Sequence, residues 1–114
     1  MPSFRTWSLA LAHSVFMSVV GMSAALADEA LAERFGCTGC HGVAGQGTGP
    51  TYEAIALRYH GVAGAREILS EKVATGGAGN WAKETGGVGM PRYSILLSSE
   101  EIQALVDWVL AQGG

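Results

Sequence analysis

One short stretch of this chain decides its interpretation, Cys37-Thr38-Gly39-Cys40-His41. Its two cysteines are the only two among 114 residues, and they enclose just two positions. A disulfide across so short a loop would constrain the unfolded chain very little, because the entropic gain grows with the length of the closed loop. The cysteines are therefore better explained together with the histidine that follows them than as a cross-link.

A C-x-x-C-H run is the attachment signature of c-type haem. Two thiols three positions apart can form thioethers with the vinyl groups on one edge of a porphyrin, while the adjacent imidazole reaches the iron from the same side. We therefore expect Cys37 and Cys40 to hold one haem c, and His41 to be an iron ligand. Three alternatives remain open. A thioredoxin-like pair is expected near a βαβ pattern, a zinc site needs a fourth ligand, for which only His60 is obvious, and a chance cluster would leave an ordinary surface histidine.

The sixth position of an electron-carrying haem iron has two candidate ligands. Met90 is the one methionine after residue 27, and it lies in the run Gly-Val-Gly-Met-Pro at residues 87–91. That run has no helical periodicity, so it is a poor place for the gap-filling core role that methionine usually has. His60 closes an apparent helix, where a partly exposed histidine is ordinary. We therefore expect ligation by His41 and Met90.

The first 27 residues have the layout of a secretory signal. Arg5 is the only charged side chain before an apolar run over residues 7–20, and Ala-Leu-Ala at residues 25–27 supplies an A-x-A cleavage site. A retained membrane anchor is the alternative, because the apolar part approaches the ~20 residues that span a bilayer. Cleavage is favoured, and it predicts a periplasmic protein of one domain, residues 28–114, that is not bound to the membrane.

Charge and size limit the class of partner. Without the signal segment, six Lys and Arg residues face ten Asp and Glu residues, a net charge of about −4. An acidic domain argues against nucleic acid as a partner and allows redox proteins with basic docking surfaces. A domain this small usually needs a metal or a cross-link in addition to its apolar core. We expect a monomer stabilised by its cofactor.

Four helical stretches are legible and no strand of comparable quality competes with them, so an all-α fold is expected. The first three cover residues 28–35, 52–59 and 65–75. In the third, Ile68, Leu69 and Val73 should point inward.

The last helix has the clearest pattern. Ser98 followed by Glu101 predicts a capping box. An apolar stripe of Ile102, Leu105, Val106 and Val109 follows and ends before Gly113.

Two long segments, residues 41–51 and 76–97, show no convincing periodicity. In a compact domain, structureless loops of about twenty residues are uncommon unless they are functional. Wrapping around a large flat apolar ligand would explain them.

With these residues in view, the sequence resembles the class I cytochromes c of the short bacterial periplasmic type over nearly all of residues 28–114. The resemblance is carried by Phe35-Gly36 before the C-x-x-C-H run, Gly49-Pro50-Thr51-Tyr52, residues 76–81, Met90-Pro91 and residues 105–110.

The resemblance implies a small cytochrome c fold, about four helices with long loops wrapped around one covalently attached haem. It implies crossed first and last helices, so that Phe35 packs near Leu105 or Trp108. It also implies that the Pro50 carbonyl accepts a hydrogen bond from the His41 ring.

The family pattern further implies that Trp81 donates to a haem propionate. Here, however, residues 82–85 are inserted between this tryptophan and the Met-Pro run. Lys83 or Arg92 could take the propionate role instead, and Trp81 could be an ordinary buried aromatic. The pair of tyrosines at positions 52 and 59 is expected in the core, although one of them could also contact the haem.

These residues predict a periplasmic electron carrier with no catalytic residues, and hence not an enzyme. With both axial positions occupied, the iron changes charge without changing ligands. Two alternatives remain open, a haem subunit of a larger dehydrogenase and a gas- or peroxide-binding haem protein.

Overall fold

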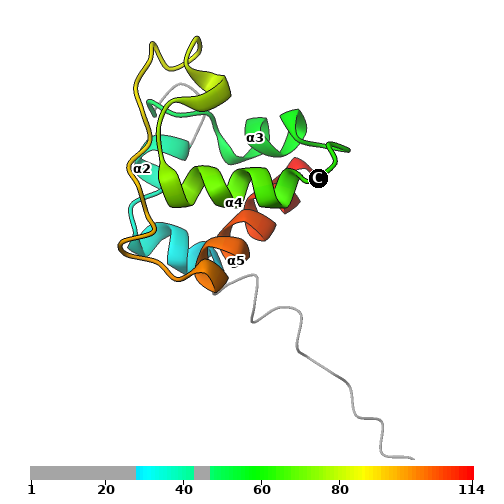
Figure 1. Ribbon diagram of the computed structural model, residues 1–114. Helices are drawn as coiled ribbons and strands as arrows, with labels where there is room; N and C mark the ends of the chain where they lie inside the picture. Colours follow the sequence, from blue (N-terminus) through cyan, green and yellow to red (C-terminus); the bar gives the residue numbers. More distant parts are fainter. Residues whose placement is uncertain (1–27, 43–46) are drawn as a thin grey trace, which may run out of the picture.

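The protein is described by a computed structural model that covers residues 28–42 and 47–114 (Figure 1). Its elements are a helix over residues 28–34, α2 (Thr38–His41), α3 (Tyr52–Arg58), α4 (Ala65–Thr75), α5 (Ser99–Leu110) and the short 3-10 helices η1 (Gly79–Trp81) and η2 (Ala111–Gly113). Within these ranges no strand occurs, and the one β-type contact is an isolated bridge between Gly77 and Met90. The predicted all-α fold is confirmed. The expected signal segment lies outside the described residues.

The ends of α3 and α4 follow from local chemistry. Thr51 caps α3, because its Oγ1 accepts a hydrogen bond from the Ala54 N–H at 3.0 Å. Beyond α3 the chain turns through Gly61 at a φ of 70°. α4 ends at Gly76, whose φ of 75° and ψ of −161° lie in a region that is essentially restricted to glycine. Both helices therefore end within a residue or two of where the sequence predicts.

The capping box at the start of α5 is confirmed. The Ser98 Oγ accepts from the Glu101 N–H at 3.2 Å, and a Glu101 carboxylate oxygen accepts from the Ser98 N–H at 2.8 Å. Three residues of the predicted stripe are buried, Ile102, Leu105 and Val106.

The helix of residues 28–34 packs against α5. Ala32, Leu97, Ile102 and Leu105 form one buried cluster, against which Phe35 and Trp108 also pack. The predicted packing of Phe35 beside the last helix is therefore confirmed. In addition, α3 and α4 both contact α5, so this last helix holds the domain together.

Ile68, Leu69 and Val73, the residues predicted to point inward from α4, differ in how deeply they are buried. Leu69 is buried and Val73 is half-buried, but Ile68 is 44% exposed. All three line one cavity, and Val73 also packs against the buried cluster that includes Ile102 and Leu105 of α5. The predicted inward side of α4 is therefore confirmed, with Ile68 as its most exposed residue.

The long segment between α4 and α5 is drawn yellow to orange along one side of the helices (Figure 1). It is closed on itself by two hydrogen bonds, from the Gly77 N–H to the Met90 carbonyl at 2.9 Å and from the Met90 N–H to the Gly77 carbonyl at 3.1 Å. The Tyr93 N–H then donates to the Val73 carbonyl of α4 at 3.1 Å. The expected loop is thus a fixed structure with defined anchors. None of the helices in the described ranges is long and apolar enough to cross a membrane.

Candidate functional site

A cavity of about 370 Å³ is lined by residues of α2, α3, α4, α5 and the long loop. Its volume lies within the range of small-molecule and cofactor sites, and its walls are mostly apolar. All four residues predicted for the site, Cys37, Cys40, His41 and Met90, line it. His60 is exposed and is not among the lining residues.

The short helix α2 brings both thiols to the same cavity. Cys37 is the N-cap of α2 with helical φ and ψ of −57° and −40°, and its carbonyl accepts from the His41 N–H at 2.9 Å. Side chains three positions apart on a helix share one face, so Cys37 and Cys40 project together. Both cysteines are free. Burial raises the pKa of the Cys37 thiol above its ordinary value, which keeps the free thiol protonated at neutral pH.

The His41 ring is oriented by the backbone that follows it. Its Nδ1 lies 2.7 Å from the Pro50 carbonyl oxygen. Because a carbonyl can only accept, Nδ1 carries a proton, and in the neutral ring Nε2 then has the lone pair that can bind a metal. The contact implied by the family resemblance is therefore confirmed. Gly49 allows this approach, since a Cβ there would lie 2.8 Å from Cε1 and 2.9 Å from Nδ1 of the ring.

Tyr52 connects this histidine to α5. Its ring centroid lies 6.0 Å from that of His41 at an interplanar angle of 29°, and 4.8 Å from that of Trp108 at 70°. Its hydroxyl lies 3.1 Å from the Thr38 Oγ1. Burial raises the pKa of Tyr52, so the phenol stays neutral. Tyr52 is both a packing residue and part of the cavity wall, and the half-buried Tyr59 also lines the cavity.

The backbone of Met90 is held closely by the glycines at the end of α4. Gly76 is buried, and a Cβ on it would lie 2.5 Å from the Met90 carbonyl oxygen and 3.0 Å from the Arg92 nitrogen. Together with the bridge to Gly77, this close approach fixes the position of the Met90 backbone within the loop.

Lys72 is a cavity residue that the sequence interpretation missed. It lies in the last turn of α4, and its Nζ donates to the Gly76 carbonyl at 3.0 Å. A Cβ on Gly79 would approach the Lys72 side chain to 2.8 Å. The available signal was a lysine in the last turn of a helix that ends in glycine, a position from which lysine often binds the final carbonyls.

The three residues considered for the propionates lie in different surroundings. Trp81 is half-buried and lines the cavity, whereas Lys83 and Arg92 are exposed and are not among its lining residues.

The residues of this cavity fit a haem c. Two free thiols from one turn, an imidazole whose Nδ1 is bound to Pro50 so that Nε2 is left free, and a methionine on a constrained loop all border the same apolar space. In the part of the chain that the structure describes, no group of three or more His, Cys, Asp or Glu side chains is placed to hold a metal ion by itself.

Comparison with known proteins agrees with this geometry. The cytochrome c family model matches residues 25–112. The chain is 41% identical over 95 residues to cytochrome c-551 of Allochromatium vinosum, covering 83% of this chain and 96% of that relative. It is 44% identical over 87 residues to cytochrome c2 of Rhodocyclus tenuis, covering 75% and 92%. The crystal structure of wild-type Nitrosomonas europaea cytochrome c552 superimposes with a TM-score of 0.63 at 31% identity, covering 74% of this chain and 98% of that one. The chain therefore belongs to the cytochrome c family, as a class I electron-transport protein with one covalently bound haem c.

Proposed function

We propose that this protein is a periplasmic carrier of single electrons, whose haem is attached through Cys37 and Cys40 and whose iron is held by His41 and Met90. The observation that carries the proposal is the shared cavity. His41 and Met90 both line it, the Nδ1 of His41 is bound to the Pro50 carbonyl, and the rival ligand His60 lies outside.

When bound, the haem supplies a one-electron redox couple. The chain contributes the surroundings that tune this couple. A thioether is a neutral, soft ligand that raises the potential relative to a second imidazole. The hydrogen bond to Pro50 raises the basicity of the His41 ring and fixes its orientation. Apolar walls exclude water, which also favours the less charged state of the site.

Two features of the chain support a carrier with no substrate of its own. His41 and Met90 would hold both axial positions of a bound haem, and the loop that carries Met90 is closed by its bridge to Gly77. His60, the remaining histidine of the described residues, is exposed outside the cavity, where it cannot act as an acid or base on a small molecule at the iron.

The ligand assignment is tested with paired variants of the matured protein, Met90→Ala and His60→Ala. Met90→Ala should remove the weak far-red absorption expected of ferric iron bound to sulfur, lower the potential, and let imidazole bind the ferric protein tightly. His60→Ala is the matched control, and it should leave all three properties unchanged. The assignment is wrong if His60→Ala opens the iron and Met90→Ala does not.

Export is a separate part of the proposal. The A-x-A site at residues 25–27 supports a mature chain that begins at or near Asp28. Intact mass of the protein purified from an exporting host measures this directly. A membrane-bound product that still contains Trp7 would show that the segment is retained as an anchor.

A further inference from the structure

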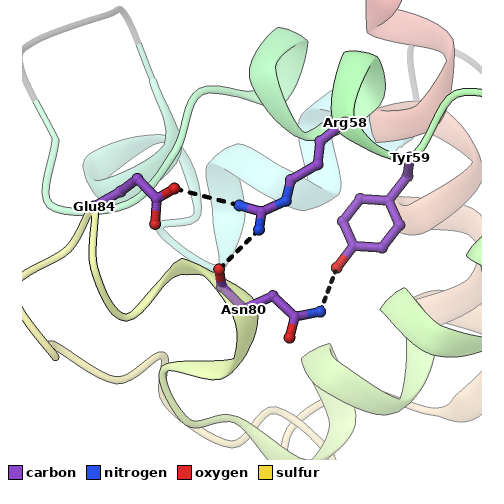
Figure 2. Close-up of polar contacts among 4 residues, drawn as sticks. All are labelled: Arg58, Tyr59, Asn80 and Glu84. Atoms are coloured by element: carbon purple, nitrogen blue, oxygen red, sulfur yellow. Dashed lines mark hydrogen bonds and ion pairs between the residues drawn. The ribbon is translucent and has the colours of Figure 1, made fainter.

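Arg58, in the last turn of α3, makes three contacts with one segment of the long loop. Its Nη2 donates to the Asn80 carbonyl at 3.0 Å, and its Nη1 lies 3.5 Å from a carboxylate oxygen of Glu84 (Figure 2). Its guanidinium carbon lies 4.2 Å from the centroid of the Trp81 ring, a cation–π distance. One side chain therefore contacts three different residues between positions 80 and 84.

The neighbouring residue adds a fourth contact. The Asn80 Nδ2 donates to the Tyr59 hydroxyl at 3.5 Å, as Figure 2 also shows. Among the hydrogen bonds and ion pairs of residues 28–42 and 47–114, those of Arg58 and Tyr59 are the ones that join α3 to residues 79–85.

The segment that Arg58 contacts, residues 80–84, continues as a compact turn toward Met90. The Thr85 N–H donates to the Trp81 carbonyl at 3.0 Å, and the Gly87 N–H donates to the Ala82 carbonyl at 2.7 Å. The Thr85 hydroxyl then donates to the Val88 carbonyl at 3.2 Å. Val88 is two residues before the methionine. The hydrogen bonds of the turn therefore link the residues that contact Arg58 to the chain next to the proposed ligand.

We propose that Arg58 is a positioning residue for Met90. The bridge to Gly77 fixes the backbone of Met90 itself. The contacts of Arg58 fix the turn that precedes Met90 in the loop. Glu84, within the turn that precedes Met90, supplies the carboxylate for the ion pair with Arg58. The proposal rests on the proposed function, since it requires Met90 to be the ligand that exogenous molecules must displace.

The test compares Arg58→Met with Arg66→Met in the matured protein. Arg66 is a matched control because it also makes an exposed ion pair, with Asp107 at 2.7 and 3.0 Å, but that pair ties α4 to α5 away from the loop. The measurement is the affinity of the ferric protein for imidazole, read from the visible spectrum, beside the guanidinium unfolding midpoint. Arg58→Met should raise the affinity about tenfold, which corresponds to about 1.4 kcal/mol, and Arg66→Met should leave it unchanged.

Two further variants sharpen the result. Glu84→Gln should raise the affinity in the same direction by a smaller factor, because it removes one contact of the three. In the Met90→Ala background, Arg58→Met should have no further effect, since no methionine remains to be positioned.

Different failures have different meanings. Equal imidazole affinities for Arg58→Met and Arg66→Met, or a tenfold effect that persists without Met90, would overturn the positioning role while leaving the proposed function intact. A Met90→Ala variant that binds imidazole no better than the wild type would overturn both.

Discussion

Replacement of Gly76 by alanine probes the tightest backbone contact of the Met90 loop. The φ of 75° and ψ of −161° at this residue lie in a region that costs other residues about 1–3 kcal/mol. The added Cβ would also lie 2.5 Å from the Met90 carbonyl oxygen, a backbone atom that cannot rotate away. Overpacking of this kind costs roughly 1–3 kcal/mol more. The variant should therefore lose about 2–6 kcal/mol, a large share of the ~5–15 kcal/mol by which native domains are stable.

Guanidinium unfolding of the matured protein measures this loss as a fall in the midpoint at constant m-value. Gly61→Ala is the matched control, because Gly61 has a φ of 70° but a Cβ added there would meet nothing within 4 Å. It should lose only the cost of a left-handed residue, about 1–2 kcal/mol. Equal losses for the two variants would refute the argument that Gly76 is required for the close approach of Met90. The far-red band should weaken in Gly76→Ala and stay intact in the control.

Three further predictions concern other anchors of the site and fold. Gly49→Ala should push the His41 ring away from Pro50, since the new Cβ would lie 2.8 Å from the ring, and a shifted potential without loss of covalent haem would show this; an unchanged potential would contradict it. Ser98→Ala should cost about 1 kcal/mol in guanidinium unfolding, because the variant loses the cap of α5, and a neutral result would mean that the cap adds nothing. Backbone and Ser99 hydrogen bonds lower the pKa of Glu100 below its ordinary value of 4.5, so its contribution to stability is present above that pH and is lost as the pH falls through the lower, folded-state pKa. Glu100→Gln should therefore show a smaller loss of stability on acidification than the wild type, and parallel acid profiles would exclude this contribution.

Much of the site could be predicted because several of its binding residues are close together in the sequence and form a known motif. The C-x-x-C-H run predicted the haem, and all four proposed binding residues line one cavity. Ser98 and Glu101 predicted a capping box because both partners lie within one helical turn. The His41–Pro50 contact followed from the family resemblance, since spacing alone does not predict which carbonyl a histidine binds.

The features that the sequence did not predict are mainly very short helices and contacts between residues far apart in the chain. α2 has four residues and η1 has three, too few for periodicity to reveal. Ile68 shows that a helical pattern marks an apolar face without telling a packed core from the wall of a cavity. The contacts of Arg58 with Asn80 and Glu84 span more than twenty positions, so only the folded chain brings them together.

We propose that the protein exchanges single electrons at an iron whose two axial positions are both occupied by side chains of the chain. A potentiometric titration of the matured wild-type protein, with and without carbon monoxide, tests it most directly. We expect a single one-electron transition of about 59 mV per tenfold change in the ratio of oxidised to reduced protein, with the same midpoint in both conditions. A midpoint that rises in carbon monoxide would mean that the reduced iron is open to ligands and that the protein is not a simple electron carrier.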